Sequence, residues 1–135
     1  MSNDDLKQRI EAIETGYEFM LAYAAQGRQT DKGGGSGSKL REHLNGMVGA
    51  LDGLGAAATN AAAAIEAEFP KVGEAFFAAV DNDARIALAA LRLVLARADI
   101  SSQLIDNLNA SIHLRALLTD LFIVDEALRP PQPGA

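Results

Sequence analysis

The sequence predicts an all-α protein, specifically a four-helix bundle with a long Gly-rich loop between helices 1 and 2 and a Pro-rich C-terminal tail. Apolar residues recur three and four positions apart along four segments, the periodicity of helices that bury one face. No segment alternates apolar and polar residues as a strand does. Glycine, serine and proline gather at the segment boundaries. We therefore expect a single helical domain over residues 1–129 and a disordered tail over residues 130–135.

The first predicted helix covers residues 4–26. Polar residues at its start can cap it, and Gly27 is placed to end it. A second apolar strip, which contains Phe19 and Tyr23, lies beside the main seam, so we expect this helix to be covered on two sides. The main seam consists of Leu6, Ile10, Ile13, Tyr17, Met20 and Ala24.

Residues 27–38 are predicted to form a flexible loop, because they lack periodicity and are rich in glycine. Two origins stay open for residues 33–38: a native connector, or a linker of the kind used in protein engineering. The length of the loop permits both an up-down arrangement of the helices and a crossover. The pattern therefore leaves the topology undecided.

The second predicted helix covers residues 38–69, with Ser38 as its cap and Pro70 as its stop. Several glycines lower its helix propensity, and Gly55 is the expected point of any division. One face of this helix carries the seam Leu40, Leu44, Met47, Leu51, Leu54, Ala58, Ala62, Ile65 and Phe69. A different face carries the small residues Gly46, Gly49, Ala50, Gly53, Ala57 and Ala64.

The third and fourth predicted helices cover residues 70–98 and 101–128. Residues 81–83 could interrupt the third helix, whereas an ion pair between Asp81 and Arg85 would keep it continuous. Either of two serines caps the fourth helix, and the prolines after it prevent its continuation. The seam of the third helix is Val72, Phe76, Val80, Ala84, Ala87, Leu91, Val94 and Ala98; that of the fourth is Leu104, Leu108, Leu114, Leu118, Leu121, Val124 and Leu128.

Charge and composition exclude several classes of function. A net charge of −6 and a pI near 4.8 have the wrong sign for a protein that neutralises phosphates, so general nucleic-acid binding is not expected. The absence of cysteine excludes disulfides and thiolate metal sites. No apolar run is long enough to span a membrane, and the first residues do not resemble a signal peptide. We therefore expect a cytoplasmic protein with no membrane partner.

A di-metal carboxylate site of the ferritin kind is not predicted, because neither histidine follows a glutamate by three positions. Glu14 and Glu18 lie on one flank of the first helix, and with a histidine they form a weak alternative metal or acid/base site. A solvated flank is the more common outcome. No metal or cofactor is therefore expected. His113 is expected to be packed or hydrogen-bonded, since no orienting acid stands at a recognisable offset from it.

The loop and the start of the second helix form a basic segment of net charge +3 in an acidic chain. Glycine N–H groups, hydroxyls and a helix N-terminus are groups that bind anions. Because Ser38 rather than glycine precedes Lys39, the loop is not a nucleotide-binding P-loop. A flexible connector is therefore favoured over an anion site, whose residues would be Arg28, Ser36, Ser38, Lys39 and Arg41.

Two hypotheses of function follow. The first is a non-enzymatic interaction protein that self-associates as a homodimer, because the small-residue face and the second apolar strip need cover. This hypothesis also allows a further protein partner. The residues of the predicted dimer interface are Gly46, Gly49, Ala50, Gly53, Ala57, Phe19 and Tyr23. The second is a bundle that binds a phosphate or nucleotide, or acts catalytically, through the Gly-rich loop and the N-terminus of the second helix.

Overall fold

A computed structural model describes residues 2–35, 37–65 and 69–128, and the regular structure within these ranges is entirely helical. The all-α prediction is confirmed for this part of the chain. The predicted tail lies outside the described residues. The helices are α1 (Ser2–Ala24), α2 (Gly37–Leu51), α3 (Leu54–Ile65), α4 (Phe69–Leu95), α5 (Ser102–Asn109) and α6 (Ile112–Ala127).

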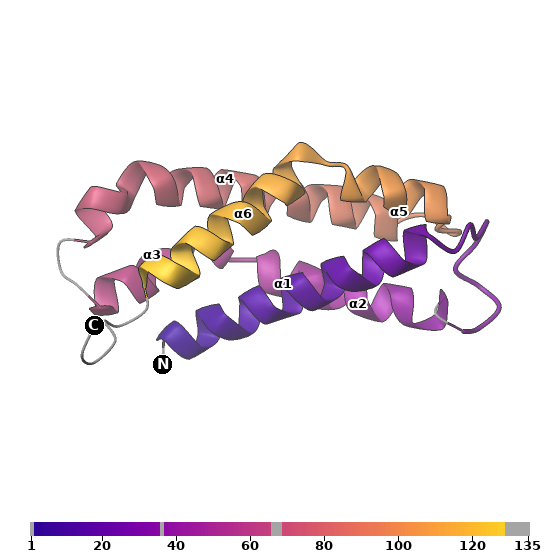
Figure 1. Ribbon diagram of the computed structural model, residues 1–135, viewed down its shortest axis with the longest axis horizontal. Helices are drawn as coiled ribbons and strands as arrows, with labels where there is room; N and C mark the ends of the chain where they lie inside the picture. The colour runs from indigo at the N-terminus through magenta and orange to yellow at the C-terminus, as the bar shows by residue number, and fades with distance from the viewer. Residues whose placement is uncertain (1, 36, 66–68, 129–135) are drawn as a thin grey trace.

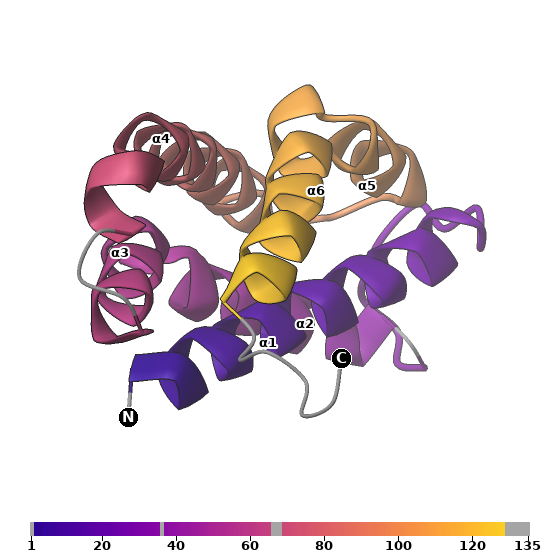
Figure 2. The same ribbon diagram turned by 60° about the vertical axis from the view of Figure 1, so that its left-hand side comes forward.

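The helices lie in two layers along the long axis of the molecule (Figure 1). One layer holds α1, α2 and α3, and the other holds α4, α5 and α6, as the turned view also shows (Figure 2). The chain reverses direction after α1, after α3 and after α4, so that α2 and α3 together return along α1 (Figure 1). Between the layers, α1 packs on α5, while α2 and α3 pack on α4.

The core consists mainly of the predicted seams. Ile13, Met20, Leu44 and Leu91 are each fully buried, as expected for apolar residues on facing helix stripes. The prediction fails at the start of α4, where Val72 is 85% exposed and Phe77 takes a place in the core. The predicted seam of this helix begins with residues spaced four apart. Because a helix has about 3.6 residues per turn, each step of four rotates the side chain by about 40°, so the first residues of the seam turn away from the core.

The predicted second helix divides at Gly53, not at Gly55. Gly53 has φ +82°, a conformation that favours glycine. Arg9 of α1 stabilises this turn, because its Nη1 donates to the carbonyl oxygens of Ala50 at 3.1 Å and Asp52 at 2.6 Å. Gly55 is instead buried beneath the side chain of Asp81, and a Cβ there would overlap it.

The predicted fourth helix is also two helices, since α5 ends at Asn109 and α6 begins at Ile112. Ser101 caps α5 as expected, with its hydroxyl accepting the N–H of Leu104 at 3.1 Å. By contrast, α4 is continuous through residues 81–83 and ends at Leu95, three residues earlier than predicted. The predicted ion pair is present, with Arg85 Nε 2.8 Å from Asp81 Oδ2.

No helix in the described part of the chain combines the length and the hydropathy that a membrane span requires.

Candidate functional site

The Gly-rich loop is bound to the connection between α4 and α5. Arg28 and Ser102 exchange two hydrogen bonds, one from each backbone N–H, both 2.8 Å long. Thr30 donates its hydroxyl to Asp99 Oδ1 at 2.6 Å, and Lys32 Nζ lies 3.6 Å from the same oxygen. The hydrogen bond and ion pair hold the pKa of Asp99 below its ordinary value. The described part of this loop is therefore joined to the other layer of the molecule.

The guanidinium groups predicted to bind an anion are engaged within the chain. Arg28 donates to the carbonyl oxygens of Thr30 at 3.1 Å, Lys32 at 3.1 Å and Gly34 at 3.3 Å. Arg41 donates to Asp31 and to carbonyl oxygens at the end of α4. An anion would have to displace these bonds, so the geometry does not favour this site.

The remaining residues of the predicted anion site are not gathered around a common point. Lys39 is exposed on α2, and Ser36 lies outside the described residues. Ser38 lies within α2 rather than at the cap position predicted for it, and its hydroxyl donates to the carbonyl oxygen of Gly35 at 2.8 Å. Lys39 instead lines a different pocket, between α1 and α2, together with Glu11 and Glu42.

The predicted interface residues occupy three different environments. Gly46 and Gly49 are exposed, and a Cβ at either would meet nothing within 4 Å. Ala50 and Ala57 are buried in the core, while Gly53 forms the turn between α2 and α3. The small-residue face is therefore shorter than the sequence indicates.

The second apolar strip of α1 packs inside the chain. Tyr23 is fully buried, and its hydroxyl donates to the carbonyl oxygen of Ile100 at 2.6 Å. Phe19 is half-buried and stacks on the ring of His43, with ring centroids 4.2 Å apart. Within the chain, Tyr23 therefore offers no surface for the dimer interface to which the sequence assigned it.

The alternative metal or acid/base site on Glu14 and Glu18 lacks its histidine. His43 is stacked on Phe19, and His113 Nδ1 lies 3.2 Å from Asp83 Oδ1. Among the residues that the structure describes, no group of three or more possible ligands is placed to hold a metal ion. His113 is exposed and within hydrogen-bond distance of Asp83, which is one of the two environments expected for it.

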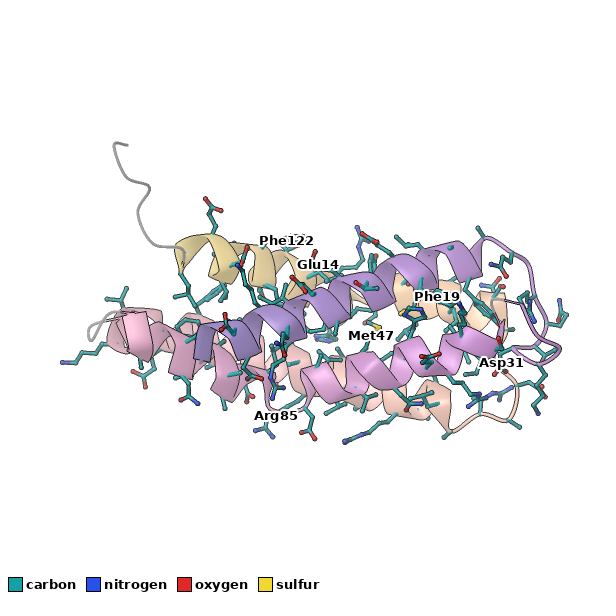
Figure 3. The ribbon with its side chains drawn as sticks, turned by 90° about the horizontal axis from the view of Figure 1, so that it is seen from below. Glu14, Phe19, Asp31, Met47, Arg85 and Phe122 are labelled. Carbon is teal, nitrogen blue, oxygen red and sulfur yellow. The ribbon has the colours of Figure 1, made fainter. Side chains whose placement is uncertain are left out.

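Glu14 and Glu18 instead line a groove between α1 and α6, which lie beside one another in both views (Figures 1 and 2). The groove has a volume of about 510 Å³. In Figure 3, Glu14 of α1 and Phe122 of α6 lie at the same edge of the molecule, far from Asp31 at the loop end. The groove is lined by Glu14, Tyr17, Glu18, Ile112, Arg115, Ala116, Leu118, Thr119 and Phe122.

The walls of this groove expose large apolar side chains. Ile112 is 77% exposed and Phe122 is 56% exposed, although both are the kind of residue that a helix normally buries. Both residues lie off the predicted seam of α6, and this was the signal in the sequence that could have located the groove. The off-seam apolar residues of α6 were not singled out from the sequence, although those of α1 were.

Within the groove, Glu14 is a carboxyl whose ionised form is destabilised by its surroundings. Burial raises the pKa of its carboxyl, and the negative charges of Asp125, Glu18 and Glu11 raise it further. Arg115 is the one cation of the lining, but it forms no ion pair with either glutamate among the described residues.

No family model, curated protein or solved structure matches this chain. The groove's function is therefore inferred from its own chemistry. Ligand sites in proteins usually combine apolar and aromatic side chains with a small number of charged groups that fix the orientation of the ligand. The groove thus combines partly exposed apolar side chains with the charged groups of Glu14, Glu18 and Arg115.

Proposed function

We propose that this chain is a helical interaction protein that acts by binding, and that its binding site is the groove between α1 and α6. The observation that carries this proposal is the exposure of Ile112 and Phe122 on the walls of one groove. Exposed apolar side chains that line one groove are typical of interaction sites, whereas scattered ones are common on any surface.

The fold supports a rigid site. We propose that it is a four-helix bundle in which α2 with α3 and α5 with α6 form the second and fourth rods. The groove then lies between the first and fourth rods, on helices whose other faces are fixed in the core by residues such as Ile13 and Leu121. A site built on packed helices holds its shape better than one built on loops.

A neutral apolar probe tests this function. We expect naphthylmethanol, added to the full chain, to shift the amide NMR signals of residues such as Tyr17, Thr119 and Phe122. Phe122→Ser removes one aromatic wall and is expected to weaken binding about tenfold, since such a contact contributes about 0.5–1.5 kcal/mol beyond its buried area.

Leu93→Ser is the matched control, because Leu93 is 74% exposed on α4 and does not line the groove. It is expected to bind the probe as the unmodified chain does. Equal binding by Phe122→Ser and the unmodified chain, or shifts spread over the whole surface, would contradict the proposal.

Self-association is the second candidate function, and it remains a prediction. The open backbone at Gly46 and Gly49 favours it, because a second helix can approach α2 closely there. A cytoplasmic location also stays a prediction.

A further inference from the structure

The chemistry of the groove also indicates which class of ligand it accepts. Glu14 and Glu18 are one turn apart on α1, so both carboxylates lie on the same wall. Ile112 and Phe122 belong to the opposite wall, on α6. A ligand in the groove therefore meets carboxylates on one side, and on the other side it meets apolar side chains together with Arg115 and Thr119.

On the α1 wall, Glu14 and Glu18 form no ion pair with any of the described residues. Glu14 is destabilised as an anion by its partial burial and by the three carboxylates that repel it. The ion pairs that the described arginines form are made elsewhere: Arg9 with Asp5, Arg41 with Asp31 and Arg85 with Asp81. A positive charge brought by a ligand would lower the free energy of ionised Glu14.

The aromatic residues of the groove complement the same charge. Tyr17 and Phe122 line it, and the faces of aromatic rings attract ammonium groups electrostatically. The volume of about 510 Å³ falls within the range of roughly 300–1,000 Å³ that holds small molecules. A phosphate or carboxylate would be repelled by the two glutamates, with Arg115 as the single cation of the lining.

We propose that the groove between α1 and α6 binds an organic cation, namely an ammonium group attached to an apolar or aromatic body. The ammonium group lies against Glu14 and Glu18, and the apolar body lies against Ile112 and Phe122. This proposal rests on the proposed function, because it names the ligand class of the same groove.

Three probes with one aromatic body separate the two proposals. Naphthylmethylammonium is positive, naphthylmethanol is neutral and naphthylacetate is negative at neutral pH. Each is titrated into the full chain at low salt, and affinity is taken from the amide NMR shifts of groove residues. We expect the cation to bind about tenfold more tightly than the alcohol, which is about 1.4 kcal/mol, because the two carboxylates attract its positive charge. The anion is expected to bind most weakly.

Glutamine variants locate the charge that is responsible. Glu14→Gln and Glu14→Gln with Glu18→Gln are expected to reduce the preference for the cation over the alcohol stepwise, while the alcohol binds as before. Glu42→Gln is the matched control: it removes the same charge from an exposed position on α2, outside the groove, and should keep the full preference.

Each outcome decides one of the proposals. If the alcohol and the cation bind equally, the groove is a binding site but the cation proposal is overturned. If the preference survives in the double glutamine variant, the charge assignment is overturned. If no probe shifts the groove signals, the proposed function itself fails.

Discussion

The guanidinium of Arg41 joins the buried carboxylate of Asp31 to the C-terminal end of α4. Its Nε donates to Asp31 Oδ2 at 2.7 Å, and its Nη1 and Nη2 donate to the carbonyl oxygens of Leu95 at 3.0 Å, Arg97 at 2.7 Å and Ala98 at 3.2 Å. The other oxygen of Asp31 accepts the N–H of Ile100 at 3.0 Å. One ion pair therefore fixes the loop, α2 and the turn after α4 together.

Asp31→Ala is expected to lower the free energy of unfolding by about 2–4 kcal/mol, because it leaves the N–H of Ile100 and the Nε of Arg41 without their acceptor. Asp31 is only 6% exposed, so water replaces the lost acceptor poorly. Urea unfolding measures the loss. Asp5→Ala breaks the exposed Arg9–Asp5 pair and should cost less than about 1 kcal/mol. Equal losses in the two variants would contradict the role given to Asp31.

Asp31 also makes stability depend on pH. Burial alone would raise the pKa of its carboxyl, but the hydrogen bonds from Arg41 and the N–H of Ile100 outweigh burial and hold that pKa below its ordinary value of 3.8. A carboxyl whose pKa is lowered by folding stabilises the protein fully above its unfolded pKa, and this stabilisation is lost as pH falls through the folded pKa. Unfolding measured from pH 6 downward should therefore show a steeper loss of stability for the unmodified chain than for Asp31→Asn.

Asp120 is expected to have the opposite effect. Burial and the neighbouring charge and hydrogen bond of Asp83 raise the pKa of its carboxyl, so the native state binds this proton more tightly than the unfolded state does. Asp120→Asn mimics the protonated form and should stabilise the protein at neutral pH, by no more than about 1 kcal/mol. The gain should shrink as pH falls through the raised pKa. A variant that is less stable than the unmodified chain at neutral pH would contradict this expectation.

The helix seams could be read from the sequence because they depend on local spacing. Ile13, Met20 and Leu44 are buried where the pattern predicted. The breaks could not be located in this way, because the turn at Gly53 is held by Arg9, which is 41 residues from Ala50 and 43 from Asp52. Contacts of such separation depend on the packing of whole helices.

The candidate site could be predicted only in part from the sequence, because it too depends on contacts between distant segments. The carboxylates of Glu14 and Glu18 were singled out, but their neighbours on α6 are set by the break after Asn109, which the sequence pattern did not predict. Arg28 and Arg41 are residues of the kind that bind anions, but both donate to backbone carbonyl oxygens. A sequence pattern cannot show such bonds, because every residue has a carbonyl oxygen. Glycine and arginine content alone therefore did not reveal that these two guanidinium groups are engaged within the chain.

Gly16 and Gly46 should respond to alanine in opposite ways. A Cβ at Gly16 would overlap the side chain of Met47, whereas a Cβ at Gly46 meets open space. We expect Gly16→Ala to destabilise the chain by about 1–3 kcal/mol through overpacking, and Gly46→Ala to stabilise it by about 0.4–1 kcal/mol through reduced backbone entropy of the unfolded state. Thermal and urea unfolding of both variants check the signs, and a stabilised Gly16→Ala would contradict the close contact of α1 with α2.

The predicted dimer is tested at Gly49, because Gly53 has a positive φ and leucine there would strain the turn. Light scattering after size exclusion, repeated over a wide concentration range, gives the mass of the unmodified chain. We expect a dimer that Gly49→Leu weakens without loss of helicity, since the new side chain would separate the two backbones. Gln103→Leu adds the same side chain to an exposed position on α5 and should leave the dimer intact. A monomer at every concentration, or a dimer that Gly49→Leu leaves unchanged, would count against this interface.

The pKa of Glu14 should report an occupied groove. In the free protein, burial and three neighbouring carboxylates raise this pKa above its ordinary value of 4.5. A bound cation favours the ionised form of the carboxyl, so saturating naphthylmethylammonium is expected to lower the pKa of Glu14. By linkage, the cation should bind more weakly once the pH falls below that pKa. A pH titration of the side-chain carboxyl NMR signal, with and without the ligand, measures the change, and the exposed Glu42 serves as the internal reference. Naphthylmethanol brings no charge, so it should not lower the pKa of Glu14. A similar fall of this pKa with both ligands would mean that the packing around the carboxyl has changed. That outcome would contradict a cation beside Glu14.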